Sequence, residues 1–220
     1  MRKFQLFLKR AFDIFVSLIL IVLLTVIPVL IVVPILIKLT SKGPAVFTQD
    51  RAGKDGKVFK IYKFRTMLIP EESFDKDGNQ LEPKQRITKV GRFLRKTSLD
   101  ELMQLFNVLN GTMSIVGPRP TLPYQVEKYT PEQMHRLDMR PGVTGWAQVN
   151  GRNELSWTEK ISFDIEYVEK FSLWFDIKIL FKTVAVVLKM DGIEFKKYDS
   201  ITNKKPETTE EDKEKVEINK

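Results

Sequence analysis

Residues 12–37 read FDIFVSLILIVLLTVIPVLIVVPILI, an apolar run in which only Asp13, Ser17 and Thr25 are polar. Because about 20 apolar residues are enough for a helix to cross a bilayer, the run predicts a membrane segment. A cleavable signal peptide is a poorer explanation. Its apolar part usually ends within about 15 residues at small side chains, whereas this run leads into KLTS at 38–41.

Two prolines decide how this segment lies in the membrane. Pro28 and Pro34 each remove a helical hydrogen bond. If the helix breaks at Pro28, the arms 12–27 and 28–37 measure roughly 24 Å and 15 Å, and neither crosses about 30 Å of hydrocarbon. The residues therefore leave two forms open, a re-entrant segment and a kinked spanning helix whose neighbours satisfy the freed carbonyls.

Basic residues lie on both sides of the run. Arg2, Lys3, Lys9 and Arg10 precede it, and Lys38, Lys42, Arg51, Lys54 and Lys57 follow it. Under the positive-inside rule both ends are expected on the cytoplasmic side. In either form the richer second flank keeps the downstream domain in the cytosol.

Composition excludes several kinds of site. The 220 residues suit one compact domain with accessories, and the absence of cysteine excludes disulfides, thiolate catalysis and Cys-ligated zinc. A single histidine, His135, cannot form a histidine metal cluster. The net charge of +8 favours anionic partners such as phosphorylated small molecules, acidic lipids or nucleic acid, and does not choose among them.

The body of the chain predicts a short hairpin and several helices. Residues 45–48 and 58–64 are rich in Val, Phe, Ile and Tyr, with GKDG at 53–56 as the turn. The polar stretch 71–83 is expected to be a surface loop. Glycine and proline punctuate 116–120, 140–146 and 150–153, which we expect to be rigid loops that each present an arginine.

Helices are expected at 156–170 and 173–189. In the second, Lys178, Lys182 and Lys189 recur on one face. This helix could lie in the headgroup plane or pack as a domain helix with snorkelling lysines, and the sequence does not decide. From residue 199 the chain is mostly charged and polar, which predicts a disordered tail.

An acidic pair, Asp100 and Glu101, follows Ser98 at the start of a predicted helix that ends near residues 110–111. Ser98 and Glu101 have capping-box spacing. Acidic residues favour first turns for stability alone. The neighbouring Arg92, Arg95 and Lys96 favour a functional interpretation, because cations should lower the pKa of Asp100 and keep it ionised as a nucleophile toward phosphorus. Glu101 could ligate Mg²⁺.

Arginines in rigid turns are the candidate phosphate ligands. Arg119 and Arg152 lie in such turns, and planar guanidinium groups suit diphosphates. Arg65 follows Lys63 on a predicted strand and is a weaker candidate. Each of these arginines could instead be an ordinary surface charge.

Six segments in order resemble the monotopic bacterial phosphoglycosyl transferases, the bacterial sugar transferases that initiate polysaccharide and glycoprotein glycan assembly. They are KRAFD at 9–13, FKIYKFRTM at 59–67, SLDEL at 98–102, VGPRP at 116–120, RPGVTGW at 140–146 and NGRN at 150–153. The resemblance runs from about residue 9 to residue 188.

The resemblance implies a reaction and a set of site residues. Asp100 would attack the sugar-bearing phosphate of a UDP-sugar, release UMP and form a covalent intermediate that polyprenyl (undecaprenyl) phosphate resolves. Glu101 would hold Mg²⁺ or assist proton transfer. The substrate-binding candidates are Arg119, Lys63, Arg65, Arg95 and Arg152.

The resemblance also implies a re-entrant helix, broken in the family at a Ser-Pro pair. Here the pair is Ile27-Pro28, so the serine is absent, and Thr25 is the expected substitute partner for the freed carbonyls. The expected site of action is the cytoplasmic face of the bacterial plasma membrane. Expected partners are membrane lipids and downstream glycosyltransferases, and no nucleic acid is expected.

The sequence thus predicts a helix-rich α/β fold, a small catalytic domain with a short β-hairpin mounted on a re-entrant membrane helix. The expected division is a membrane helix at 1–40, a catalytic domain with interfacial helices at 41–198 and a charged tail at 199–220. A non-catalytic membrane adaptor for anionic lipid or nucleic acid, and a conventional glycosyltransferase that releases UDP, are the alternatives. The sequence identifies neither the sugar, the pathway nor the oligomeric state.

Overall fold

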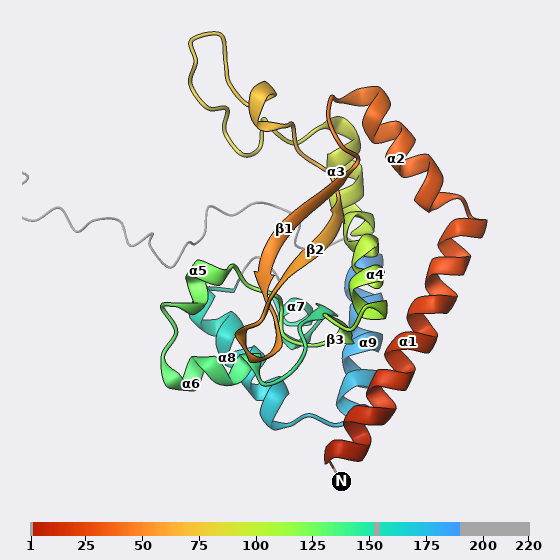
Figure 1. Cartoon of the computed structure of the whole chain (residues 1–220), viewed down its shortest axis with the longest axis vertical. Coiled ribbons are helices and arrows are strands. Elements are labelled where there is room, and N and C mark those ends of the chain that lie inside the picture. The colour runs from red at the N-terminus through yellow and green to blue at the C-terminus, as the bar shows by residue number, and fades with distance from the viewer. Residues whose placement is uncertain (1, 152–154, 190–220) are drawn as a thin grey trace, which may run out of the picture.

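The computed structural model describes residues 2–151 and 155–189 (Figure 1). Its elements, in order, are α1 (Arg2–Val26), α2 (Val29–Thr40), β1 (Val46–Ala52), η1 (Lys54–Gly56), β2 (Val58–Phe64), η2 (Pro70–Glu72), α3 (Lys89–Lys96), η3 (Leu99–Met103), α4 (Gln104–Leu109), β3 (Ser114–Val116), α5 (Pro123–Val126), α6 (Pro131–Met134), η4 (His135–Leu137), β4 (Gly142–Thr144), α7 (Trp146–Val149), α8 (Trp157–Glu169) and α9 (Leu173–Lys189). The fold is helix-rich α/β, as predicted. The predicted tail at 199–220 lies outside the described residues, and the predicted division at residue 40 stays a prediction.

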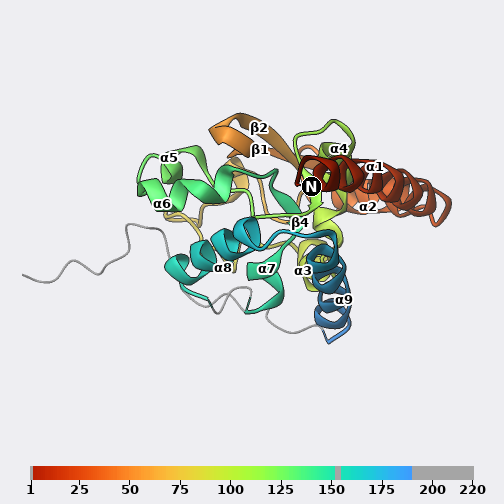
Figure 2. The same ribbon diagram turned by 90° about the horizontal axis from the view of Figure 1, so that it is seen from below.

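The N-terminal apolar run forms two helices rather than one. α1 and α2 meet at an angle of 60° at Pro28, and among the described residues no single helix is both long and apolar enough to cross a bilayer, whereas the bent pair passes that test together. Both helices lie along one side of the molecule, away from α5, α6 and α8 (Figure 2). The break between α1 and α2 therefore lies at Pro28, as the sequence predicts.

Thr25 does not take the role expected of it at this break. Its hydroxyl donates to the Ile21 carbonyl at 2.8 Å, one turn back within α1. The Ile27 amide still donates to the Leu23 carbonyl at 2.9 Å, and the Pro28 carbonyl accepts from Val32 at 2.8 Å. The prediction that Thr25 satisfies the freed carbonyls is therefore wrong, because its side chain bonds toward the preceding turn.

The predicted hairpin is confirmed. β1 and β2 pair antiparallel from Val46 opposite Phe64 to Ala52 opposite Val58, so the first strand is longer than its apolar residues suggest. The turn passes through Asp55 at φ 57° and Gly56 at φ 72°. Positive φ favours glycine and tolerates aspartate, so the GKDG sequence supplies what this turn needs.

A second, parallel sheet was not expected. β3 and β4 pair in parallel, with Ser114 opposite Gly142 and Val116 opposite Thr144, in segments that the glycine and proline content assigned to loops. The backbones at Gly117 and Gly142 lie very close together, since a Cβ on Gly142 would lie 2.1 Å from the Gly117 amide nitrogen. Only glycine permits this contact, so the glycines mark backbone packing as well as turns.

Two apolar clusters form the core. The larger gathers residues from β2, α4, β3, α8 and α9, among them Ile61, Val108, Val116, Tyr167 and Ile179. The smaller joins α2 to β2 and α3 through Val33, Ile37, Phe64 and Leu94. The second membrane-type helix is thus packed on the domain along one face.

Polar residues of α1 dock it on the domain. Lys9, Asp13 and Ser17 are buried at successive i, i+4 positions. Lys9 Nζ lies 2.6 Å from Asp176 Oδ2 on α9, while Asp13 accepts from the Ser114 hydroxyl at 2.8 Å and from the Ile115 amide at 3.1 Å. These residues hold the helix to the domain, a role the sequence did not indicate.

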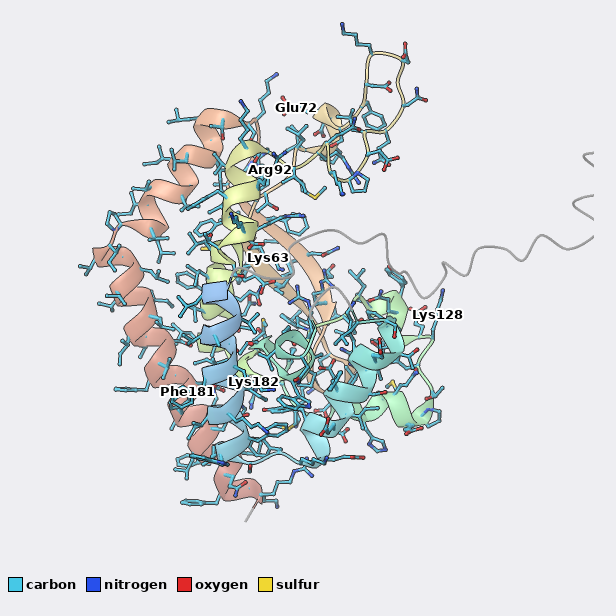
Figure 3. All side chains as sticks on the ribbon, turned by 180° about the vertical axis from the view of Figure 1, so that it is seen from behind. Lys63, Glu72, Arg92, Lys128, Phe181 and Lys182 are labelled. Atoms are coloured by element: carbon cyan, nitrogen blue, oxygen red, sulfur yellow. The ribbon has the colours of Figure 1, made fainter. Side chains whose placement is uncertain are left out.

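The last two predicted helices are confirmed as α8 and α9. α9 exposes an apolar stripe that includes Trp174, Phe181 and Leu188. Lys178 and Lys182 lie over the Trp146 ring, with Nζ 5.3 Å and 4.5 Å from its centroid. In Figure 3, Phe181 points away from the domain and Lys182 toward it. These two lysines therefore face the domain, opposite to the expectation for an interfacial helix.

Candidate active site

The acidic pair lies in the short helix η3, not in the first turn of an α-helix. Ser98 adopts φ 57°, its side chain makes no capping hydrogen bond, and α4 begins only at Gln104. The predicted capping box is therefore wrong, because the Glu101 amide donates to the Ser98 carbonyl at 3.3 Å and not to its side chain. A non-glycine residue held at positive φ costs roughly 1–3 kcal/mol and is typical of functional sites.

Glu101 is the centre of a charge cluster. Its Oε1 accepts from Lys63 Nζ on β2 at 2.8 Å and from Arg119 Nη2 at 3.0 Å. Lys63 and Glu101 are each 20% exposed at the side chain, and Arg119 is 48% exposed. The structure therefore brings together three of the residues predicted from sequence.

The ionisation of Glu101 follows from these contacts. Burial by itself raises the pKa of Glu101, but Arg119 and Lys63 outweigh it and lower the pKa to about 2. Burial lowers the pKa of Lys63, an effect that Glu101 opposes. Glu101 is thus a permanent anion that holds two cations.

Asp100 is in a different state. Within 2–151 and 155–189 its carboxylate makes no hydrogen bond or salt bridge, although Lys63, Arg95 and Arg119 act on it electrostatically. Burial and then the Glu101 charge raise the pKa of Asp100 despite those cations. The expected lowering is therefore wrong in direction, because desolvation and a like charge outweigh the attraction. Asp100 is thus a partly buried carboxylate without a bonded partner among the described residues.

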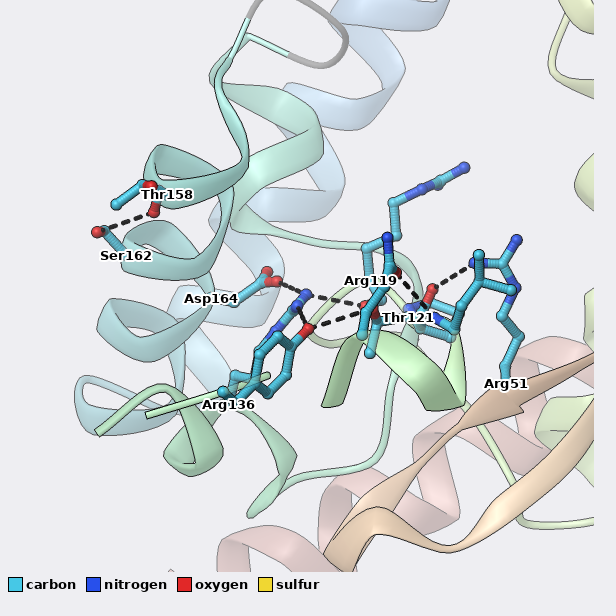
Figure 4. Close-up of polar contacts among 11 residues, drawn as sticks. Arg51, Arg119, Thr121, Arg136, Thr158, Ser162 and Asp164 are labelled. Carbon is cyan, nitrogen blue, oxygen red and sulfur yellow. Dashed lines mark hydrogen bonds and ion pairs between the residues drawn. The ribbon is translucent and has the colours of Figure 1, made fainter. Parts of the chain in front are cut away.

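The loop that carries Arg119 is fixed by a buried ion pair. Arg136 and Asp164 form a salt bridge with side chains 3% and 0% exposed, and Arg136 Nη2 donates to the Arg119 carbonyl at 3.0 Å (Figure 4). On the other side, the Thr121 carbonyl accepts from the Ala52 amide at 2.8 Å. The Arg119 side chain thus extends from a backbone held at both ends.

Comparison with known proteins decides the family. Residues 4–190 match the sequence model of the family described as bacterial sugar transferase. The chain belongs to this family. It is homologous to undecaprenyl-phosphate sugar-1-phosphate transferases at about 44% identity.

Three relatives of this sugar transferase illustrate the match. It is 44% identical over 187 residues to the uncharacterized sugar transferase EpsL of Bacillus subtilis, and the matched region covers 85% of this chain and 90% of that protein. It is 44% identical to the undecaprenyl-phosphate galactose phosphotransferase of Salmonella typhimurium (84% of this chain, 41% of that protein). It is 47% identical to the UDP-glucose:undecaprenyl-phosphate glucose-1-phosphate transferase of Escherichia coli (80% and 39%). The chain therefore spans about two fifths of the last two relatives. Their lipid-linked acceptors, with the bent apolar helix pair, indicate membrane association.

The other predicted ligands of this sugar transferase lie in different places. Arg95 donates from Nε to the Thr66 hydroxyl at 2.7 Å and acts electrostatically on Asp100. Arg65 is buried, and its guanidinium donates to the carbonyls of Ser41 and Lys42 beyond the end of α2. Arg152 lies outside the described residues. The structure thus places Arg95 beside Asp100 and turns Arg65 toward the segment that follows α2.

Sequence reasoning missed Arg51 as a residue of the site of this sugar transferase. It lines a narrow crevice of about 20 Å³ together with Ile61, Lys63, Gln104, Arg119 and Pro120. Burial is the main cause that lowers the pKa of Arg51 to about 10, and the nearby Arg119 charge adds to it. From sequence, Arg51 was interpreted only as a basic residue that flanks the apolar run. Its position near the end of a strand was the signal that could have placed it at the site.

The metal prediction depends on one carboxylate, that of Glu101. The part of the chain that the structure describes contains no group of three or more acidic, histidine or cysteine side chains able to hold a metal. Mg²⁺, however, usually takes one or two carboxylates and completes its shell with water and substrate phosphates. Glu101 is a carboxylate of that kind, and its Oε1 already accepts from Lys63 and Arg119.

Proposed function

We propose that this chain transfers a sugar-1-phosphate from a UDP-sugar to undecaprenyl phosphate and releases UMP, as an initiating step of polysaccharide synthesis. The activities named for the relatives supply the reaction class. The single observation that carries the proposed mechanism is the acidic pair, in which Glu101 is bonded to two cations and Asp100, among the described residues, is bonded to none.

In the proposed first step, an Asp100 carboxylate oxygen attacks the sugar-bearing phosphorus. A new phosphorus–oxygen bond forms, the bond to the UMP oxygen breaks, and UMP leaves with that electron pair. In the second step an oxygen of undecaprenyl phosphate attacks the same phosphorus and displaces the carboxylate. Neither step requires an added oxidant, reductant or net proton transfer.

The neighbouring charges support this division of roles. The raised pKa of Asp100 makes its carboxylate a stronger nucleophile once ionised. Lys63, Arg119 and Arg51 supply positive charge around the crevice, where charge develops on the phosphate oxygens. Glu101 positions Lys63 and Arg119 rather than attacking.

Mg²⁺ is part of the proposal. Glu101, with Asp100 beside it, would hold the ion together with substrate phosphate oxygens, and the ion would neutralise diphosphate charge. The residues of the chain would still provide the nucleophile and the cationic crevice.

The nucleotide product tests the reaction. Purified protein is incubated with undecaprenyl phosphate and UDP-glucose or UDP-galactose, the donor sugars suggested by the relatives' names. UMP supports the proposal, UDP indicates a conventional glycosyltransferase, and binding without nucleotide release favours the adaptor alternative. If neither sugar reacts, the remaining UDP-sugars are tested before the reaction is rejected.

Asp100→Asn tests the mechanism. We expect UMP release to fall by at least about a thousandfold, as for other lost nucleophiles. Asp50→Asn is the control, since Asp50 is half-exposed and contacts Lys60 on the surface. In the absence of acceptor, intact-mass measurement should detect a sugar-phosphate adduct on the wild type and none on Asp100→Asn. Full turnover by Asp100→Asn would end the covalent mechanism.

The topology proposal is a re-entrant helix pair with the catalytic domain on the cytoplasmic face. The chain lacks cysteine, so Lys3→Cys and Lys128→Cys introduce unique labels. Both should react only with reagent that reaches the cytoplasm. Labelling of position 3 from outside the cell would show that α1 and α2 cross the membrane.

A further inference from the structure

A second cavity lies apart from the crevice at Glu101. Its volume is about 240 Å³, and it is enclosed by the first half of α1, the turn of the hairpin, and the segment that joins η4 to β4. It shares no lining residue with the crevice. Five basic side chains line it, those of Arg2, Lys9, Arg10, Lys54 and Arg140. Asp13 and Asp138 are its acidic residues.

Two of these groups are already committed to the fold. Lys9 is paired with Asp176, and both Asp13 oxygens accept hydrogen bonds from β3. They hold α1 in place and are not available for a ligand. The remaining charges are four cations, those of Arg2, Arg10, Lys54 and Arg140, and the Asp138 carboxylate.

Two guanidinium groups converge on one turn. Arg10 Nη2 donates to the Leu109 carbonyl at 3.0 Å, and Arg140 Nε donates to the Gly111 carbonyl at 2.8 Å. A Cβ on Gly111 would lie 3.4 Å from Arg10 Nη2. Carbonyl groups orient these cations without neutralising them. Burial and then Arg140 lower the pKa of Arg10, so an anion between them would relieve repulsion.

The other charges of the cavity leave it positive. Arg2 Nη2 donates to the Val168 carbonyl at 3.1 Å. Lys54 contacts Asp55 at 3.6 Å, with both side chains about half exposed, a pair that contributes little in water. The Asp138 carboxylate contacts His135 Nδ1 at 3.1 Å. The cavity therefore contains more cations than its carboxylates balance.

The surroundings indicate a lipid rather than a soluble anion. Leu6 lines the cavity, and on the same turns of α1 the side chains of Phe4 and Phe7 are 65% and 68% exposed. Exposed aromatic residues beside basic groups are typical of helices in the interfacial region. We infer that this cavity binds the phosphate headgroup of an anionic phospholipid, with its acyl chains lying along the exposed apolar face of α1.

The test compares lipids on the full chain in neutral detergent. Native mass spectrometry measures binding of dioctanoyl phosphatidylglycerol, dioctanoyl phosphatidylcholine and glycerol phosphate to wild type and to Lys54→Gln/Arg140→Gln. We expect phosphatidylglycerol to bind best. The double variant should weaken its binding by roughly thirtyfold, as expected for two cations near a headgroup.

The control removes two exposed lysines elsewhere, Lys84→Gln/Lys128→Gln; Lys128 lies across the molecule from α1 (Figure 3). Its lipid binding should stay within about twofold of wild type. UMP release should persist in both variants, which separates this inference from the proposed activity. Equal losses in both double variants, no loss in Lys54→Gln/Arg140→Gln, or equally tight binding of glycerol phosphate would overturn the lipid assignment.

Discussion

The docking of α1 through Lys9 gives a prediction whose size follows from burial. Lys9→Met leaves the Asp176 carboxylate, 9% exposed, with the Tyr167 hydroxyl, at 2.7 Å, as its one remaining side-chain donor among residues 2–151 and 155–189. Removing one partner of a buried ion pair usually costs about 3–5 kcal/mol, because the other charge remains desolvated. We expect a loss of that order in the free energy of unfolding at pH 7. Lys3→Met, an exposed lysine of the same helix, should change it by less than about 0.5 kcal/mol.

The assay is urea unfolding in detergent micelles, followed by tryptophan fluorescence at several pH values. Burial is the main cause that raises the pKa of Asp176, and Lys9 opposes it. A group whose folded pKa is raised stabilises the fold at low pH and loses that contribution as pH rises through the folded pKa. Without Lys9 that pKa should rise further. The deficit of Lys9→Met should therefore shrink as pH falls below 7.

A second variant makes the result decisive. Lys9→Met/Asp176→Asn keeps an acceptor for Tyr167 and removes the unpaired charge, so it should be more stable at pH 7 than Lys9→Met alone. If the deficit of Lys9→Met does not change with pH, and Asp176→Asn gives no recovery, then the cost comes from lost packing and not from a buried charge. That result would refute the reasoning.

Two further predictions concern the site and its support. Glu101→Gln should lower stability by about 3 kcal/mol at pH 7, since a shift of the Glu101 pKa from 4.5 to about 2 corresponds to that energy. Arg119 and Lys63 lower the folded pKa of Glu101, so the extra stability of the wild type exists above about pH 4.5 and is lost as pH falls toward 2. Urea unfolding at pH 7 and pH 3 measures the difference in unfolding free energy between wild type and Glu101→Gln. A difference that is the same at both pH values would contradict the prediction. Gly91→Ala should destabilise the protein by at least about 1–3 kcal/mol, because its Cβ would lie 2.0 Å from the Thr66 carbonyl oxygen; an unchanged midpoint in thermal unfolding would show that α3 can move aside.

Local signals predicted much of the fold. Prolines interrupt helices, so Pro28 located the break between α1 and α2. β-branched and aromatic residues around a GKDG turn located the hairpin. In each case the residues that determine the element lie within a few positions of one another.

The features that were not predicted depend on contacts between residues far apart in the sequence. The β3–β4 pair joins two strands of three residues each, too short for a period-2 pattern to appear. Asp13 and Ser114 are 101 positions apart, so the sequence offered no reason to connect them. Within the candidate site, Asp100, Glu101, Lys63 and Arg119 were named from sequence. The pKa direction of Asp100 was not predictable, because it depends on how deeply the carboxylate is buried.

The contacts of Arg10 and Asp13 have a consequence for anyone who would shorten this chain. Arg10 donates to the Val108 and Leu109 carbonyls at the end of α4, and Asp13 accepts from β3. Deleting α1 would remove hydrogen-bonding partners of α4 and β3 and would expose the apolar residues that α1 covers. α1 is thus a structural part of the folded domain, and a version truncated before β1 would need replacement side chains where α1 contacts α4 and β3 before it could be expected to fold.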